Sequence, residues 1–110
     1  MEITTEKTNG VIVLKVEIDV LDAGNTNAFK AAISPLLNGN NRVLLDLTKL
    51  TFIDSSGCGN LLSCYNQMKN RGGMLKICGV REQVLEIFDL IRLDRIIDIF
   101  KTKEAALKEF

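Results

Sequence analysis

The sequence predicts an α/β fold in which a small mixed β-sheet, with a mostly parallel core and an N-terminal hairpin, is packed with about four helices. Short runs of β-branched and apolar residues alternate with segments whose apolar residues recur at helical spacing, which indicates βαβ units. With 110 residues, 46% of them hydrophobic and 25% charged, the chain has the size and composition of one globular domain. We therefore expect a single domain spanning residues 1–110.

Two strands are expected at the start of the chain, over residues 3–7 and 11–18, because both runs are rich in β-branched residues. Thr8-Asn9-Gly10 separates them and predicts a hairpin. Residues 22–26 form a polar break that can cap a helix, whose apolar positions are Phe29, Ile33, Leu36 and Leu37. The run Asn-Gly-Asn-Asn at 38–41 should end this helix, and Pro35 should kink or shorten it.

The second half of the chain continues the alternation. The almost wholly apolar run 43–47 predicts a strand covered on both faces in the middle of the sheet. A helix should follow residues 54–57 and end at Arg71-Gly72-Gly73, with a strand over 74–78 after it. A further helical stripe, the segment 95–100 and a short helix from Thr102 complete the chain. The apolar positions of the two helices are Leu61, Leu62, Tyr65 and Met68, then Val84, Ile87, Phe88 and Ile91.

Composition excludes several classes of function. Lys+Arg and Asp+Glu both total 14, so no net charge attracts nucleic acid or a membrane surface. The N-terminus lacks the features of a signal peptide and no apolar run approaches about 18 residues, which predicts a cytoplasmic protein. Histidine is absent, which removes His-based catalysis and His metal ligands, and the three cysteines are expected as reduced thiols. A monomer is the default expectation.

The most informative segment runs from Leu45 to Gly59, where a buried strand leads into a turn of small residues and a helix start. It ends in Phe52-Ile53-Asp54-Ser55-Ser56-Gly57-Cys58-Gly59. The two serine hydroxyls can cap free backbone N–H groups, and the two glycines let another backbone or a phosphate come close. Spacing alone favours an ordinary capped helix start, because Ser-Gly pairs are common there.

The stretch from Phe52 to Gly59, together with Val43-Leu44-Leu45-Asp46-Leu47 before it, resembles the phosphorylation motif of STAS domains in bacterial anti-sigma factor antagonists. The resemblance extends over nearly the whole chain, from the hairpin to the terminal helix. Asp22 matches the aspartate that the family carries in the loop before its first helix. Two positions depart from the family pattern: Asp19 replaces a usual glycine, and Cys58 replaces a usual aliphatic residue.

The resemblance implies a partner-switching protein rather than an enzyme. Its phosphoacceptor would be Ser56, the second serine of the motif, phosphorylated by an anti-sigma factor that is also a serine kinase. The unphosphorylated form would bind that kinase and free the sigma factor, and a metal-dependent serine phosphatase would reset the cycle. ATP and Mg²⁺ would belong to the kinase, so no cofactor and no metal are assigned to this chain.

The expected partner-binding face comprises the Asp22 loop, the turn from Asp54 to Gly59 and the exposed side of the helix after it. Asp22 and Ser56 are assigned from the resemblance, and the others because they lie near the motif. The residues of this face are Asp22, Asp54, Ser55, Ser56, Gly57, Cys58, Gly59, Asn60 and Ser63.

Other readings of the same residues remain. Ser56 could be a nucleophile, but without histidine it would need a lysine base, and nothing in the sequence places Lys49 or Lys69 beside it. Cys58 and Cys64 have no metal-ligand spacing and are expected in the core. Asp46 could be an active-site acid at the end of a strand, but the resemblance implies a structural and interface role at the sheet edge. The alternative function is a STAS scaffold or ligand-sensing module without a sigma-factor output.

Overall fold

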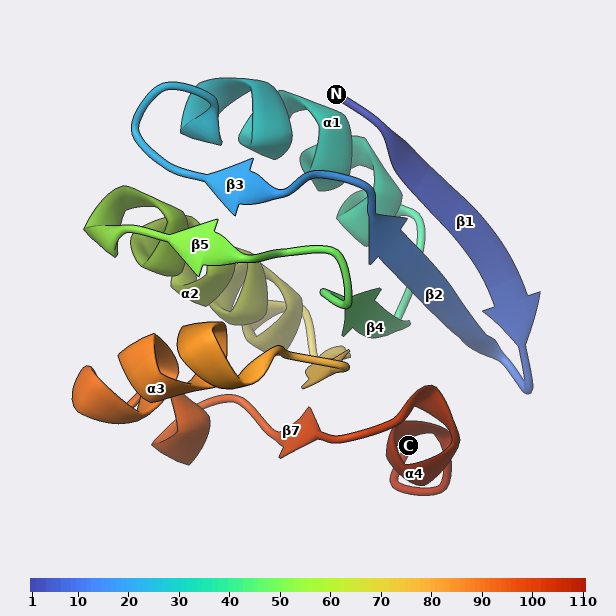
Figure 1. Cartoon of the computed structure of the whole chain (residues 1–110). Coiled ribbons are helices and arrows are strands. Elements are labelled where there is room, and N and C mark those ends of the chain that lie inside the picture. The colour runs from blue at the N-terminus through green and yellow to red at the C-terminus, as the bar shows by residue number, and fades with distance from the viewer.

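The main sheet has five strands in the order β1-β2-β4-β6-β7, and the computed structural model describes all of residues 1–110 (Figure 1). β1 runs antiparallel to β2, whereas β4, β6 and β7 continue the sheet in parallel. The predicted mixed sheet with a parallel core and an N-terminal hairpin is thus confirmed. The strands are β1 (Ile3–Thr8), β2 (Val11–Val16), β4 (Arg42–Asp46), β6 (Met74–Cys78) and β7 (Ile99–Phe100).

The hairpin closes through Asn9 and Gly10, which both have positive φ, at 54° and 79°. Two central residues of this kind form the turn whose twist matches that of paired strands. β2 ends at Val16, two residues earlier than the sequence predicted. The chain leaves the main sheet there, because Val20 and Leu21 pair with a different segment.

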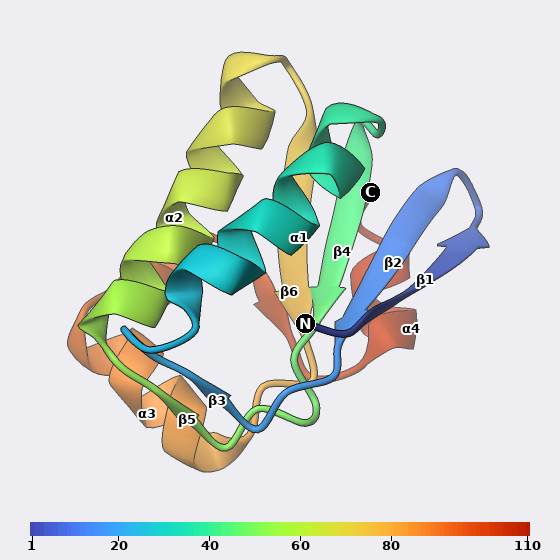
Figure 2. The ribbon, with the colours of Figure 1, turned by 90° about the horizontal axis from the view of Figure 1, so that it is seen from above.

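β4 lies in the middle of the sheet, as its apolar sequence predicted, and both of its faces are covered. Val43 and Leu45 belong to the large core cluster beneath α1 (Thr26–Asn38) and α2 (Ser55–Asn70). Leu44 belongs to a smaller cluster on the other face, where α4 (Lys103–Leu107) contributes Ala106. Figure 2 shows α1 and α2 side by side in front of the sheet and α4 behind it. The two faces therefore carry helix layers of very different size.

A second, two-stranded parallel sheet was not predicted. It consists of β3 (Val20–Leu21) and β5 (Phe52–Ile53), which lie between the main sheet and the first turns of α1 and α2 (Figure 2). α3 (Glu82–Leu90) packs beside β5, and the 3-10 turn Leu93–Arg95 packs against α3 and leads into β7. None of the helices has both the length and the hydrophobicity that a bilayer-spanning segment needs.

Pro35 was expected to kink or shorten the first helix, and it does not shorten it, because α1 continues past it to Asn38. Proline removes one backbone N–H, so the carbonyl four residues earlier, at Ala31, loses its helical partner. Both Pro35 and Ala31 are exposed. Water can therefore reach that carbonyl, and the helix tolerates the proline on its solvent side. Its end at the Asn-Gly-Asn-Asn run is as predicted.

Candidate functional site

The first turn of α2 is organised by Asp54, which caps the helix. One carboxylate oxygen, Oδ1, accepts the backbone N–H of Gly57 at 2.9 Å, and Oδ2 accepts the N–H of Ala23 at 3.0 Å. These bonds, the Gly57 bond above all, stabilise the ionised form and hold the pKa of Asp54 below its ordinary value. The side chain is therefore an anion that is already engaged by the backbone on both of its oxygens.

Ser56 is the second residue of α2, and its side chain is exposed. Its hydroxyl makes no hydrogen bond within the protein, in contrast to the carboxylate of Asp54 two residues earlier. Because the first N–H groups of a helix have no partner in the preceding turn, this position lies in the positive end of the helix dipole. The hydroxyl is thus free to react, and a negative group added to it would meet a favourable field.

A loop that is distant in sequence lies against this turn. The N–H of Ala23 reaches Asp54 across 31 residues of chain, and the loop is shaped by its own bonds. Asp22 Oδ1 accepts the N–H of Gly24 at 2.9 Å, while Asn25 Oδ1 accepts the N–H of Asp22 at 2.9 Å. The structure thus places Asp22 beside the serine turn. The part played by Ala23 could not be read from the sequence, because it rests on a backbone group.

The two glycines of the turn have different surroundings. A side chain at Gly57 would lie 2.6 Å from the carbonyl oxygen of Leu21 and 2.6 Å from Ile53, so close packing within the protein requires glycine there. A side chain at Gly59 would meet nothing within 4 Å, and the position is exposed. Internal packing therefore explains Gly57 and gives no reason for glycine at Gly59, which leaves a bare helix surface one turn after Ser56.

The structure corrects the expectation that Asn60 lies on the exposed side of α2, and it also buries two residues of the serine turn that were assigned to the partner-binding face. Gly57, Cys58 and Asn60 are buried, Cys58 in the core beneath α2 and Asn60 against the start of α1. They support the turn from within and have little surface to offer a partner. The remaining members are accessible: Ser55, Ser56, Gly59 and Ser63 are exposed, and Asp22 and Asp54 are half-buried.

The cysteine thiols and Lys69 do not have the positions that metal binding, redox chemistry or activation of Ser56 would require. Burial raises the pKa of Cys58 and Cys64 to about 11 and that of Cys78 to about 12, so all three are protonated thiols at neutral pH. Lys69 follows Ser56 by thirteen residues of the same helix, a rise of about 20 Å, and its ammonium group lies over the Tyr65 ring. It cannot serve as the base for Ser56.

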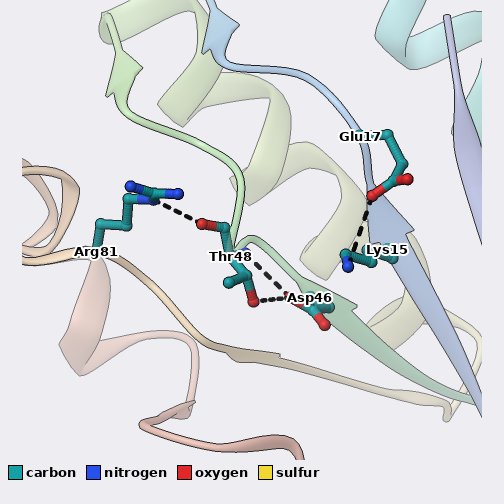
Figure 3. A network of polar contacts seen from close by, with 5 residues as sticks. All are labelled: Lys15, Glu17, Asp46, Thr48 and Arg81. Carbon is teal, nitrogen blue, oxygen red and sulfur yellow. Dashed lines mark hydrogen bonds and ion pairs between the residues drawn. The ribbon is translucent and has the colours of Figure 1, made fainter.

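Asp46 has the structural role that the sequence predicted. Its Oδ1 accepts the backbone N–H of Thr48 at 3.0 Å and also the Thr48 hydroxyl (Figure 3). Arg81 Nε donates to the Thr48 carbonyl at 2.7 Å, and Gly79, with φ of 74°, packs against the Thr48 hydroxyl. These contacts close the turn after β4, the strand whose chain continues into β5 and the serine turn.

Comparison with known proteins places this geometry in a family. A family model described as the STAS domain matches residues 2–106. The chain is similar to the anti-sigma-B factor antagonist of Bacillus subtilis, at 28% identity over 92 residues that cover 84% of this chain and 82% of that protein.

Two solved structures show the same fold. One is a Thermotoga maritima protein provisionally named an anti-sigma factor antagonist, with a TM-score of 0.89 at 27% identity over 97% of this chain and 92% of that one. The other is the Bacillus cell fate determinant SpoIIAA in its phosphorylated form, with a TM-score of 0.70 over 98% of each chain. At 20% identity, SpoIIAA supports the fold alone. From the match over residues 2–106, the chain belongs to the STAS domain family, with relatives named as anti-sigma factor antagonists.

Proposed function

We propose that this chain is an anti-sigma factor antagonist that switches partners through phosphorylation of Ser56. In the unphosphorylated form it binds an anti-sigma factor that is also a serine kinase, and in the phosphorylated form it releases it, which regulates sigma-factor-dependent transcription. The observation that carries the proposal is the exposed, unbonded hydroxyl of Ser56 at the start of α2, in a chain whose relatives bear the name of this function.

The surroundings of Ser56 suit a protein substrate of a kinase. The hydroxyl has no internal hydrogen bond that would break when a kinase active site binds it. Its entry into the active site therefore requires no local unfolding. Asp54 and the Asp22 loop fix the backbone on either side of it. A phosphoacceptor held in one position loses little conformational entropy when it enters a kinase.

Electrostatics supports release after phosphorylation. Phosphate adds about −1.5 to −2 charges to a surface where Asp22 and Asp54 are already negative. The helix N-terminus favours an added anion by about 0.3 to 1 kcal/mol, so the fold should persist. A partner that covers the turn would have to remove water from that phosphate. A penalty of about 3 kcal/mol would weaken the complex roughly a hundredfold.

The cycle needs two further proteins. ATP and Mg²⁺ are bound by the kinase, which transfers the terminal phosphoryl group to the Ser56 oxygen. A metal-dependent serine phosphatase then hydrolyses the phosphoserine and restores the binding form. In this scheme the chain is a ligand and a substrate and performs no chemistry of its own.

The test is to incubate the protein with the anti-sigma kinase encoded beside its gene and ATP. The modified site is located by mass spectrometry, and the affinity for the kinase is measured by calorimetry before and after. Ser56→Ala should bind and resist phosphorylation, and Ser56→Asp should bind about a hundredfold more weakly. Ser55→Ala is the matched control for the site of modification, because Ser55 is also exposed, at the preceding position, and its loss should leave phosphorylation of Ser56 unchanged.

Phosphate on Ser56 with loss of binding would support the switch. Equal affinity of the Ser56→Ala and Ser56→Asp variants for the kinase would sink it. If no serine were modified and the wild-type protein failed to bind, the alternative of a STAS scaffold or sensing module would replace the antagonist.

A further inference from the structure

Asn60 is the one buried residue with a polar side chain. It lies in the second turn of α2 and is 9% exposed. Its Nδ2 donates to the backbone carbonyl of Thr26 at 2.8 Å and contacts the Thr26 hydroxyl at 2.7 Å. Its Oδ1 is buried and has no hydrogen-bond partner. The amide therefore joins α2 to the first residue of α1 across 34 residues of chain.

Core packing alone does not account for an amide at this position. A buried acceptor without a partner carries a desolvation penalty, and an apolar side chain would fill the space without one. What an apolar residue could not do is donate to the carbonyl of Thr26. Both Thr26 oxygens are acceptors and lie within hydrogen-bond distance of Nδ2, so the amide nitrogen faces Thr26 and the amide oxygen does not. The hydrogen bonds from Asn60 to Thr26 therefore account for an amide at this buried position.

The bridge completes a clamp on the loop that carries Asp22. Thr26 N–H donates to the carbonyl of Asp22 at 2.9 Å, so fixing Thr26 fixes the end of the loop. Asp54 holds the middle of the same loop through Ala23 at 3.0 Å. The two clamping side chains, Asp54 and Asn60, stand on either side of Ser56 along the chain. The loop and the serine turn are thereby held as one surface.

We propose that Asn60 is a positioning residue for recognition of the kinase partner. It holds the loop from Asp22 to Thr26 in place beside Ser56 without itself touching the partner. This rests on the function proposed above. A loop that is ordered before binding loses no conformational entropy on binding, so the bridge strengthens the encounter with the partner. Phosphoryl transfer to Ser56, which is held on α2, depends on the bridge much less.

The test compares four variants of the full chain. Asn60→Ala removes the bridge, and Thr26→Val removes the hydroxyl while keeping the carbonyl, a milder change that keeps the test valid if the first variant unfolds. Thr26→Ser retains the hydroxyl and should behave as wild type. Gln67→Ala is the matched control, because Gln67 Nε2 bridges the same two helices at their other end, 2.8 Å from Asn38 Oδ1.

Two readouts are needed, and the first requires no partner. Hydrogen exchange of the Ala23 and Gly24 amides should become about tenfold faster in Asn60→Ala and about threefold faster in Thr26→Val, since local opening becomes easier. For Ser56 phosphorylation by the neighbouring kinase, KM should rise about tenfold and threefold respectively, while kcat stays within about twofold of wild type. Gln67→Ala should change neither readout.

Unchanged loop exchange in a folded Asn60→Ala protein would overturn the proposal whatever the kinase does. Faster exchange with an unchanged KM would also overturn it, because the bridge would then serve stability alone. Failure of the kinase to phosphorylate or bind the wild-type protein would instead reject the proposed function, and the positioning role in recognition with it, while the exchange measurement would still decide whether the bridge holds the loop.

Discussion

The two ends of the α1–α2 pair are built in different ways (Figure 2). At the far end, the guanidinium of Arg71 donates to three main-chain carbonyls, those of Leu37, Asn38 and Asn40, where α1 ends. At the end near Ser56 no cation is hydrogen-bonded to the turn, and the exposed serine hydroxyl has no internal partner. At the far end the polar groups are hydrogen-bonded within the protein, whereas at the near end the Ser56 hydroxyl is not.

This contrast separates groups that hold the helices together from groups that can meet a partner. A cation at the C-terminus of a helix satisfies carbonyls that lack helical partners and opposes the negative end of the dipole. The end near Ser56 relies on the neutral bridges of Asn60 and on the capped carboxylate of Asp54. The exposed Ser56 hydroxyl adds little stability at this end, which fits the binding surface proposed above.

The largest effect is expected for Gly57→Ala. The added methyl group would lie 2.6 Å from the Leu21 carbonyl oxygen, a backbone atom that cannot move without disturbing β3. We expect the free energy of unfolding to fall by about 2 to 3 kcal/mol, as for other overpacked positions. Urea denaturation followed by circular dichroism measures it. A loss below about 0.5 kcal/mol would show that the contact between the turn and β3 is not tight.

A smaller loss is expected at the other end of the helices. Arg71→Ala leaves three carbonyls of the α1 terminus without their charged donor, and the side chain is exposed, so water replaces part of what is lost. The free energy of unfolding should fall by about 1 to 2 kcal/mol. Phosphorylation of Ser56 should be unchanged.

Lys69→Ala is the matched control for Arg71. It removes a positive charge from the last turn of the same helix, where Lys69 makes no hydrogen bond to α1. Thermal denaturation of the two variants should separate the arginine bonds from the effect of charge. Equal losses would mean that charge alone stabilises this end, and slower phosphorylation of the Arg71 variant would contradict the division between the two ends.

Most of the fold could be predicted from local sequence patterns. The run from Val43 to Leu47 is apolar throughout except at Asp46, which is typical of a strand covered on both faces, and β4 lies in the middle of the sheet. β3 and β5 escaped prediction because two residues carry no periodic signal. Their pairing exists only because the chain folds residues 20 and 21 against 52 and 53.

The site was predictable where it depends on a motif and unpredictable where it depends on packing. The serine turn is read directly from residues 54–59. The expectation that the two serine hydroxyls cap the helix is wrong, because the cap is Asp54, which accepts the Gly57 N–H. Asn60 was assigned to the exposed side of α2 because it lies near the motif, yet in the structure it is buried against the start of α1. The contact between Ala23 and Asp54 joins a backbone group to a residue 31 positions away, and no pattern of side chains encodes it.

The smallest effect in stability and the most direct test of the binding surface is Gly59→Ala. Alanine is favoured over glycine inside a helix, and the position has room for a methyl group, so the variant should gain about 0.5 to 1 kcal/mol of stability. If a partner approaches the bare surface beside Ser56, the same methyl group should weaken binding of the kinase by about threefold or more. Asn66→Ala is the control, an exposed substitution one turn beyond Ser63 that should stabilise α2 without changing affinity. Calorimetry of both complexes decides the matter: an affinity for Gly59→Ala equal to that of the control would mean that the partner does not cover this part of the helix.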